Sequence, residues 1–318
     1  MGSKKIAVVD LGTNTFHVLL ARVAEEEAEI FYRERVAVMI GKGGITQGII
    51  NEEAQERALQ ALRHFRTIID QENITEIHAT ATSAFRNAHN GMALVKRIKD
   101  ETGIDIRVIT GDEEAAYIYY GVKEALDIGP ENVIVMDIGG GSVEFIICNQ
   151  QHIYWKQSFE IGAQRLLDLF QPSDPILPEE ITRLEEYFTE QLQPLALAVA
   201  DYQPVTLIGS SGTFDTLSEM YQHRINQLAP PSDATELPLS YEGYFAIARE
   251  ITSKNREERL KIPGMIEMRV DMIVVACALL SFVIKQFQLN DIRISAYALK
   301  EGVLYRTIRS LQKTMQNR

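Results

Sequence analysis

An aspartate followed by three glycines forms the stretch of this chain that is best suited to chemistry. Residues 133–145 read VIVMDIGGGSVEF, with apolar strand residues before Asp137, then Gly139–Gly141, and then Ser142 and Glu144. Glycine lets backbone N–H groups approach an oxyanion closely, because it has no side chain and accepts positive φ. A carboxylate at Asp137 would hold a hard cation beside that anion. The pattern predicts two strands whose connecting turn binds phosphate and magnesium, with an ordinary tight hairpin as the alternative.

A second copy of this pattern lies near the start of the chain. Residues 4–20 read KKIAVVDLGTNTFHVLL, again with strand residues before an aspartate and a glycine after it. Aligning Asp10 with Asp137 places Gly12 on Gly139 and puts a hydroxyl residue at the end of both turns. Such a repeat predicts two related α/β domains that face each other across a phosphate.

Length and composition are those of a globular protein with more than one core. The 318 residues are enough for two domains, with 46% hydrophobic and 24% charged residues. The net charge of −12 argues against nucleic acid or an anionic membrane surface as a partner, because both select a basic face. A polyanionic substrate would therefore have to meet a local basic patch.

The sequence shows no sign of export or membrane insertion. Its amino terminus, MGSKKIAVVD, passes directly into a strand without the apolar segment of a secretory signal. The apolar run Met272–Ile284 is too short to cross a bilayer and predicts a buried helix. Cys148 and Cys277 lie in apolar runs, as expected for buried thiols in a reducing compartment. We therefore expect a cytoplasmic protein that does not bind a membrane.

Three charged residues elsewhere have side chains suited to phosphate chemistry. Arg86 follows a strand predicted at residues 74–82, where a guanidinium could fork onto a phosphate; a surface ion pair is the simpler alternative. Glu113 and Glu114 lie in the first turn of a predicted helix, where the macrodipole alone favours acids. The functional alternative is that one of them orients a water as a general base. The residues themselves do not distinguish the two glutamates.

A third candidate anion site follows the strand that begins at Val205. The chain there reads VTLIGSSGT, so the small and hydroxyl residues Gly209–Thr213 stand at the start of a predicted helix. Free N–H groups at a helix amino terminus attract anions, although Ser and Thr are also common helix caps.

Long helices are predicted over residues 47–70, 272–287 and 299–315. Asn51 is expected to cap the first helix, whose buried stripe is Ala58, Leu62, Phe65 and Ile69. The apolar helix 272–287 is compatible with a homodimer, although burial in a core explains it equally well. The last helix is expected to pack back on the first domain.

In this order, the motifs resemble the exopolyphosphatase/guanosine pentaphosphate phosphatase family, within the superfamily of actin, sugar kinases and heat-shock chaperones. The resemblance is carried by segments that are spread along nearly the whole chain: VVDLGTNTFHVLL, ATSAFRN, TGDEEAAYIYYGV, MDIGGGSVEF, LIGSSGT, KIPGMIEMRVDMI and ISAYALKEG. It implies an α/β fold of two duplicated actin-like (ribonuclease H-like) domains with an active-site cleft between them. Domain I is expected at residues 1–126, with the helix 300–318 packed on it, and domain II at residues 127–299.

The resemblance also implies roles for individual residues. Glu114 would be the base that activates water, with Glu113 beside it, and Arg86 would bind phosphate. The implied phosphate-binding residues are Thr13, Asn14, Thr15, Gly139, Gly140, Gly141, Ser142, Gly209, Ser210, Ser211, Gly212, Thr213 and Arg269.

The resemblance implies Mg²⁺, or another divalent cation, as the cofactor. Asp137 and Glu144 correspond to the family's magnesium- and water-handling carboxylates, and Asp10 is a further candidate metal ligand. These three acids and Glu114 are all present, so the resemblance implies a working catalytic set.

The chain departs from the family pattern at three places. Val143 stands where threonine is usual, Ser210-Ser211 replaces a more glycine-rich turn, and Lys300 stands where arginine is common. None of these changes removes an implied catalytic group, but the first two would alter the grip on a phosphate chain. The chain also stops near the end of the two-domain core, so we expect it to lack the C-terminal helical domain of longer relatives.

The expected reaction is hydrolysis of a terminal phosphoanhydride by in-line attack of water, without a covalent phosphoenzyme. Two substrates are open: inorganic polyphosphate, shortened from its end, and guanosine pentaphosphate, which would lose its 5′ terminal phosphate. A kinase or ATPase of the same superfamily would need an adenosine pocket and an acceptor base, and Glu114 fits water better. A non-catalytic sensor of guanosine tetra- or pentaphosphate is disfavoured because Glu114, Asp137 and Glu144 are intact.

Overall fold

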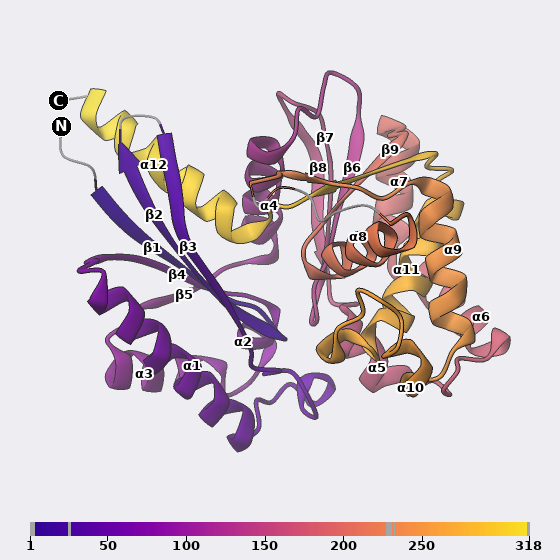
Figure 1. Cartoon of the computed structure of the whole chain (residues 1–318), viewed down its shortest axis with the longest axis horizontal. Coiled ribbons are helices and arrows are strands. Elements are labelled where there is room, and N and C mark those ends of the chain that lie inside the picture. The colour runs from indigo at the N-terminus through magenta and orange to yellow at the C-terminus, as the bar shows by residue number, and fades with distance from the viewer. Residues whose placement is uncertain (1–3, 25–26, 227–230, 232, 317–318) are drawn as a thin grey trace. The chain divides into compact units, whose positions relative to one another are not determined.

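The computed structural model describes residues 4–24, 27–226, 231 and 233–316. The chain divides into two compact units: unit 1 contains residues 1–121 and 299–318, and unit 2 contains residues 122–298 (Figure 1). The carboxy-terminal helix therefore belongs to the unit that holds the amino terminus. The division lies inside helix α4 (Gly111–Ala125), slightly before the predicted boundary at residue 126.

Unit 1 is built on a mixed sheet with the strand order β3-β2-β1-β4-β5. Strands β1, β2 and β3 form an antiparallel meander, and β4 and β5 continue parallel to β1. The strands are β1 (Lys4–Leu11), β2 (Thr15–Ala24), β3 (Glu27–Ala37), β4 (Glu76–Ala81) and β5 (Ile106–Val108). The helices are α1 (Glu52–Gln71), α2 (Ser83–Asn87), α3 (Gly91–Thr102), most of α4, and α12 (Leu299–Gln316), with a 3-10 turn at Ile45–Gln47.

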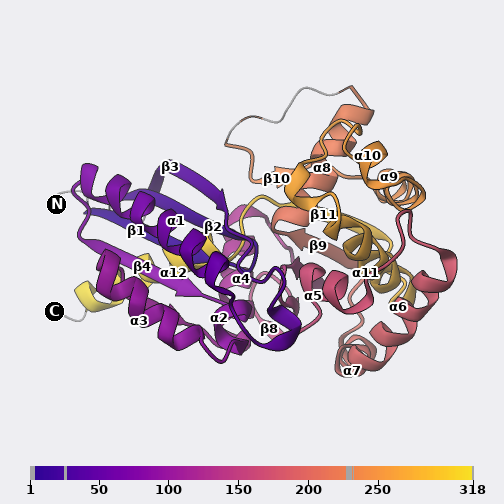
Figure 2. The same ribbon diagram turned by 90° about the horizontal axis from the view of Figure 1, so that it is seen from below.

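Strand β1 is buried on both faces. Ala7 and Val9 belong to an apolar core with the buried side chains of α1 and α3, two helices that lie side by side (Figure 2). Ile6 and Val8 are also fully buried, and α12 packs along β1 and β2 (Figure 1). Side chains alternate between the faces of a strand, so Asp10 shares its face with Ile6 and Val8.

Helix α1 forms largely as its sequence predicts. The Asn51 side chain accepts a hydrogen bond from the N–H of Ala54 at 2.8 Å, which confirms it as the N-cap. The helix begins at Glu52 and not at residue 47, because Gly48, with φ 65°, ends the 3-10 turn that precedes it. The predicted apolar stripe is fully buried at Ala58, Leu62, Phe65 and Ile69.

Unit 2 repeats this sheet with one added edge strand. Its order is β10-β11-β9-β6-β7-β8, in which β6, β7 and β8 take the places of β1, β2 and β3. Strands β9 and β11 continue parallel to β6, as β4 and β5 do to β1. The strands are β6 (Val133–Ile138), β7 (Val143–Cys148), β8 (Ile153–Phe159), β9 (Thr206–Ser210), β10 (Glu236–Leu237) and β11 (Asp291–Ser295). The two sheets confirm the predicted duplicated α/β fold.

The core of unit 2 contains helix α11 (Met272–Gln286), which is buried on nearly every side. It packs against α5, α6 and α9, as its continuous apolar sequence predicts. Cys148 and Cys277 are buried free thiols, also as predicted. The other helices are α5 (Ala163–Phe170), α6 (Pro178–Gln191), α7 (Gln193–Tyr202), α8 (Gly212–Arg224), α9 (Tyr241–Ser253) and α10 (Arg256–Arg259), with a 3-10 turn at Glu267–Arg269.

Helices α2, α7 and α10 were not expected from the sequence. Helices α2 and α10 are too short to show a helical period, and α7 follows α6 after a single residue, Leu192. Within the described residues, no helix combines the length and the apolar character that a membrane span requires.

Candidate active site

The glycine turn between β6 and β7 presents a set of backbone N–H groups. The N–H groups of residues 163–165, at the start of α5, bond to the carbonyl oxygens of Gly139 and Gly140 at 2.9 to 3.1 Å, and the Gly141 carbonyl is also an acceptor. The C=O and the next N–H of a trans peptide point in opposite directions, so the N–H groups of Gly140, Gly141 and Ser142 point away from α5. In the described part of the chain these three N–H groups have no acceptor. They form a concave anion site.

Two residues behind the turn hold it in shape. A Cβ on Gly162 would lie 2.4 to 2.5 Å from the backbone of Gly140 and Gly141, so only glycine lets α5 approach this closely. Arg165 donates from Nε to the Gly141 carbonyl at 3.0 Å and pairs with Glu160 at 2.9 Å. The turn is therefore preorganised by its contacts with α5.

The turn between β1 and β2 repeats this backbone. The Gly12 N–H bonds to the Thr15 carbonyl at 3.1 Å, and the equivalent bond in the second turn is also 3.1 Å. The carbonyl oxygens of Thr13 and Asn14 accept from the N–H groups of residues 38, 39 and 41. The Asn14 N–H therefore points away from that loop. The Thr13 side chain is buried.

A row of polar residues crosses the sheet of unit 2 next to its glycine turn, and we call it the acidic row. Asp137 lies opposite Glu144 on β7 and beside Ser210 on β9, and Glu144 lies opposite Ser158 on β8. The two carboxylates are only 6% and 1% exposed. Ser210 Oγ donates to Asp137 Oδ2 at 2.8 Å, and Ser158 Oγ donates to Glu144 Oε1 at 2.6 Å. Directly opposed carboxylates repel each other, so this row favours a bound cation.

The corresponding row of unit 1 has a different chemistry, and we call it the mixed row. Its members, from β3 to β5, are Arg35, His17, Asp10, Thr80 and Arg107. Asp10 Oδ1 and Thr80 Oγ1 are buried without a hydrogen-bond partner. Burial raises the pKa of Asp10 to about 7; Lys300 opposes this rise and Glu301 adds to it. Glu301, only 1% exposed, pairs with Lys300 at 3.2 Å.

Arg86 and Glu114, which the sequence places far apart, meet directly in unit 1. Arg86 lies in α2, just after β4, and its Nη1 donates to Glu114 Oε2 at 2.9 Å and to the Ile109 carbonyl at 3.1 Å. The Glu114 residue is 6% exposed, whereas the Arg86 side chain is 19% exposed. The contact is therefore not the surface ion pair that was the simpler alternative for Arg86.

The neighbouring Glu113 has a structural role. Its Oε2 accepts from the N–H of Thr110 at 3.0 Å, and the Thr110 hydroxyl accepts from the N–H of Glu113 at 3.2 Å. This reciprocal pair is a capping box at the start of α4. The other carboxylate oxygen of Glu113, Oε1, pairs with Arg107 at 2.7 Å. The backbone hydrogen bond from Thr110 and the Arg107 contacts lower the pKa of Glu113, so this carboxylate is already committed to stabilising the helix.

The β9–α8 junction brings together the third predicted group of residues. Ser211 precedes α8 with φ 74° and ψ 179°, a conformation that is nearly exclusive to glycine. A Cβ on Gly212 would lie 1.6 Å from Arg269 Nη2, so the guanidinium rests directly on the first residue of the helix. Arg269 Nη1 also donates to Thr216 Oγ1 at 2.7 Å. A cation beside the positive end of a helix is favourable when an anion is bound there.

Comparison with known proteins assigns the chain to a family. The profile of the Ppx/GppA phosphatase family matches residues 19–311. The chain belongs to this family. The crystal structure of an exopolyphosphatase from Cytophaga hutchinsonii is similar, with a TM-score of 0.94 and 44% identity over 96% of this chain and 98% of that one.

Two further relatives span almost the same length. The crystal structure of the Ppx/GppA family member of Aquifex aeolicus has a TM-score of 0.79 and 25% identity over 97% of this chain and 99% of that one. A Haemophilus influenzae protein, named as a candidate exopolyphosphatase, is 28% identical over 98% of this chain and 93% of that protein.

The residues of this Ppx/GppA phosphatase fit a magnesium ion at the acidic row. In the described part of the chain, no three His, Cys, Asp or Glu side chains are close enough to form a metal cage of their own. Mg²⁺ does not require such a cage, because it is usually held by one or two carboxylates together with waters and substrate phosphates. The buried Asp137–Glu144 pair beside the N–H groups of the glycine turn matches that requirement.

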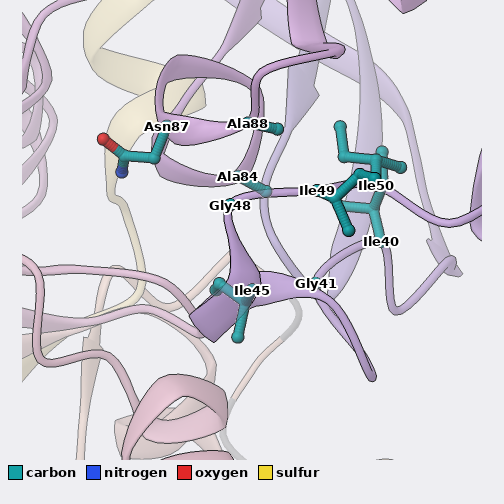
Figure 3. Close-up of a pocket in the computed structure, with 9 residues that line it drawn as sticks. All are labelled: Ile40, Gly41, Ile45, Gly48, Ile49, Ile50, Ala84, Asn87 and Ala88. Atoms are coloured by element: carbon teal, nitrogen blue, oxygen red, sulfur yellow. The ribbon is translucent and has the colours of Figure 1, made fainter.

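A small apolar hollow lies beside the loop that follows β3 (Figure 3). Ile40, Ile45 and Ile49 line it from the loop, and Ala84 and Ala88 line it from α2. Its lining contains an amide, from Asn87, but no charged group. A polyphosphate would find no cation there, so we do not include this hollow in the site.

Within each unit, the structure brings together residues that the sequence singled out. Arg86 meets Glu114 in unit 1, and Asp137, Glu144 and Ser210 share one row beside the glycine turn of unit 2. The side chain of Ser210 is directed to Asp137 and is not free for phosphate. No signal in the sequence pointed to Ser158 and Arg165, which contact the Glu144 carboxylate and the Gly141 carbonyl.

Proposed function

We propose that the protein is an exopolyphosphatase that hydrolyses the terminal phosphoanhydride bond of inorganic polyphosphate in the cytoplasm. The observation that carries this proposal is the contact between Arg86 and Glu114 at 2.9 Å. It gives a buried carboxylate a fixed direction and places a guanidinium, the group best suited to a phosphate, beside it. The similarity to the Cytophaga hutchinsonii exopolyphosphatase supports polyphosphate as the substrate.

Glu114 is the proposed general base. Its carboxylate would accept a hydrogen bond from the attacking water and align that water with the terminal phosphorus. Glu113 is less suited to this role, because both of its oxygens are engaged, one in capping α4 and the other in pairing with Arg107. The structure thus offers a physical reason to choose between two glutamates that the sequence left open.

The remaining groups would stabilise the transition state. Phosphoryl transfer passes through a loose transition state whose charge lies on the equatorial oxygens, so catalysis depends on positioning and electrostatics. The N–H groups of Gly140, Gly141 and Ser142, which have no acceptor in the described part of the chain, would take part of that charge. Arg86 and Arg269 would contact phosphate oxygens, and the N–H groups of the α8 amino terminus would bind a further phosphate.

Asp137 and Glu144 would hold Mg²⁺, with Asp10 as a further candidate ligand in unit 1. The ion would neutralise phosphate charge during transfer. The buried, directly opposed carboxylates of Asp137 and Glu144 support this assignment.

Phosphate release in the presence of Mg²⁺ tests the proposal. Long-chain polyphosphate, guanosine pentaphosphate and ATP would be compared as substrates for the wild type and for Glu114→Ala. We expect release from polyphosphate that collapses in the variant. A clear preference for guanosine pentaphosphate would instead make the protein a 5′-phosphohydrolase, and binding of guanosine nucleotide without any release would make it a sensor. Gel filtration of the same preparations would show whether it is a homodimer.

A further inference from the structure

We infer that Ser158 and Ser210 are a pair of positioning residues that orient Glu144 and Asp137 for the divalent cation. The inference rests on the proposed metal-assisted hydrolysis and adds to it the groups that prepare the metal site. The sequence assigns no role to Ser158, and the Ser210 hydroxyl, which is predicted to bind phosphate, donates to Asp137.

The two serines flank the carboxylates within a single row of the sheet. Across β8, β7, β6 and β9 the order is hydroxyl, carboxylate, carboxylate, hydroxyl: Ser158, Glu144, Asp137 and Ser210. Residues in register on neighbouring strands project from the same face, with Cβ atoms about 4.5–5.5 Å apart. Each serine is therefore on the outer side of the pair, and the two carboxylates are adjacent in the middle.

Each hydroxyl occupies one oxygen of its own carboxylate. The Ser158 Oγ to Glu144 Oε1 distance of 2.6 Å is in the range of a charge-assisted hydrogen bond, and the Ser210 Oγ to Asp137 Oδ2 distance is 2.8 Å. The terminal torsion of a carboxylate is otherwise soft. When the serine hydroxyl donates to one carboxylate oxygen, this torsion is fixed. The direction of the second carboxylate oxygen is then fixed too. Groups that hydrogen-bond to a metal ligand in this way commonly influence the affinity of the site for its metal ion.

The mixed row of unit 1 shows that this arrangement is not a general property of the fold. Arg35 replaces Ser158, His17 replaces Glu144, and Thr80 replaces Ser210. Thr80 Oγ1 makes no hydrogen bond, although it is in register with Asp10 as Ser210 is with Asp137. A hydroxyl next to an aspartate therefore does not pair with it automatically, and the two serine contacts are specific to the acidic row.

Mn²⁺ binding followed by electron paramagnetic resonance measures the effect without relying on activity. The full-length variants Ser158→Ala and Ser210→Ala would be titrated with Mn²⁺ beside the wild type, together with Ser158→Thr, which keeps a hydroxyl. The matched control is Ser218→Ala, which removes a fully buried serine hydroxyl of the same unit that donates to the Pro238 carbonyl at 2.7 Å. The Mg²⁺ concentration that gives half-maximal polyphosphate hydrolysis would be measured in parallel.

We expect each alanine variant to bind Mn²⁺ about 10-fold more weakly and to need correspondingly more Mg²⁺. The Ser218→Ala protein should match the wild type, and Ser158→Thr should recover most of the lost affinity. The inference is overturned if both alanine variants bind Mn²⁺ as the control does, while Asp137→Ala abolishes binding. If the wild type itself binds no Mn²⁺ and hydrolyses without a divalent ion, the proposed metal assistance fails and this inference fails with it.

Discussion

The acidic row and the mixed row occupy corresponding places in the two sheets, yet they differ in most of their side chains. Both cross the end of the first hairpin strand, and both adjoin a turn closed by a glycine N–H bond of 3.1 Å. In unit 2 two carboxylates stand side by side and receive hydroxyl donors. In unit 1 a single carboxylate stands among a histidine, a threonine and two arginines.

The difference shows how a duplicated backbone supports two chemistries. The turn is fixed by glycines and by main-chain hydrogen bonds, so it survives changes in the surrounding side chains. The positions beside it are free to vary. Two adjacent acids suit a divalent cation. Asp10 has no second acid opposite it in its row, and desolvation, which disfavours the charged form, raises its pKa to about 7.

The largest expected effect contrasts the residues opposite the two aspartates. Glu144→Gln removes one charge from the acidic row and should lower kcat/KM for polyphosphate by about 100-fold or more. The reason is that it weakens the site for the proposed Mg²⁺, which would stabilise the charge of the transition state. His17→Gln changes the equivalent position of the mixed row and should lower it by less than about 5-fold. Steady-state phosphate release at saturating Mg²⁺ measures both. Equal losses in the two variants would show that the rows do not differ in function.

A second prediction concerns the pH dependence of stability. Burial raises the pKa of Asp10 from 3.8 to about 7. Between these pH values the folded protein keeps a proton that the unfolded chain has lost, so the contribution of Asp10 to stability falls as pH rises. Asp10→Asn cannot ionise. It should match the wild type near pH 4 and be more stable by roughly 2–4 kcal/mol near pH 8.

Denaturant titrations in the presence of a chelator, at several pH values, test this prediction. Parallel curves for Asp10→Asn and the wild type across the whole range would contradict it. The unfolding free energy of Asp137→Asn would be measured at the same pH values as the comparison from the acidic row. This variant removes a charge and also the hydrogen-bond acceptor of Ser210.

A third prediction compares the two hydroxyl residues that stand beside the aspartates. Ser210→Ala removes a donor to a buried carboxylate and should lower the free energy of unfolding by about 1–3 kcal/mol. Thr80→Val replaces an unpaired buried hydroxyl with a methyl group and should be neutral or stabilising by up to about 1 kcal/mol. Denaturant unfolding of the two variants gives the comparison directly. A loss of stability in Thr80→Val as large as that in Ser210→Ala would mean that the two rows are equally hydrogen-bonded.

The smallest expected effect lies at the β9–α8 junction. Ser211 has φ 74° and ψ 179°, where a side chain is strained. Ser211→Gly should therefore raise the free energy of unfolding by about 1 kcal/mol. A matched Ser218→Gly variant, in the interior of α8, should instead be destabilised. Thermal melting of both variants measures the two effects. A lower Tm for Ser211→Gly than for the wild type would contradict the backbone strain inferred at Ser211.

The backbone of the site was largely predictable from the sequence. Asp137 and Gly139–Gly141 identify the turn, because an apolar strand, an acid and a run of glycines follow one another directly in the sequence. The repeat at Asp10 then indicates two related halves. The turn and its repeat depend on local sequence. The structure confirms both, because the two sheets share their strand order and each turn is closed by a hydrogen bond of 3.1 Å from a glycine N–H.

The role of Ser158 could not be read in the same way. Between β7 and β8 the register shifts at a bulge beside Ile147 and Cys148. Without that bulge Gln157 would stand opposite Glu144, and every side chain beyond it would change faces. The role of Glu113, in contrast, was available from the sequence, since Thr110 followed three residues later by a glutamate is the pattern of a capping box.

The most direct test of Glu114 as the general base compares two isosteric variants of neighbouring residues. Glu114→Gln and Glu113→Gln each remove one carboxylate from the first turn of α4, and kcat for polyphosphate hydrolysis would be measured for both at saturating Mg²⁺. We predict a fall of about 100- to 10,000-fold for Glu114→Gln. For Glu113→Gln we predict a small change in kcat with some loss of stability. A large fall in Glu113→Gln with near-normal turnover in Glu114→Gln would contradict the assignment of the base.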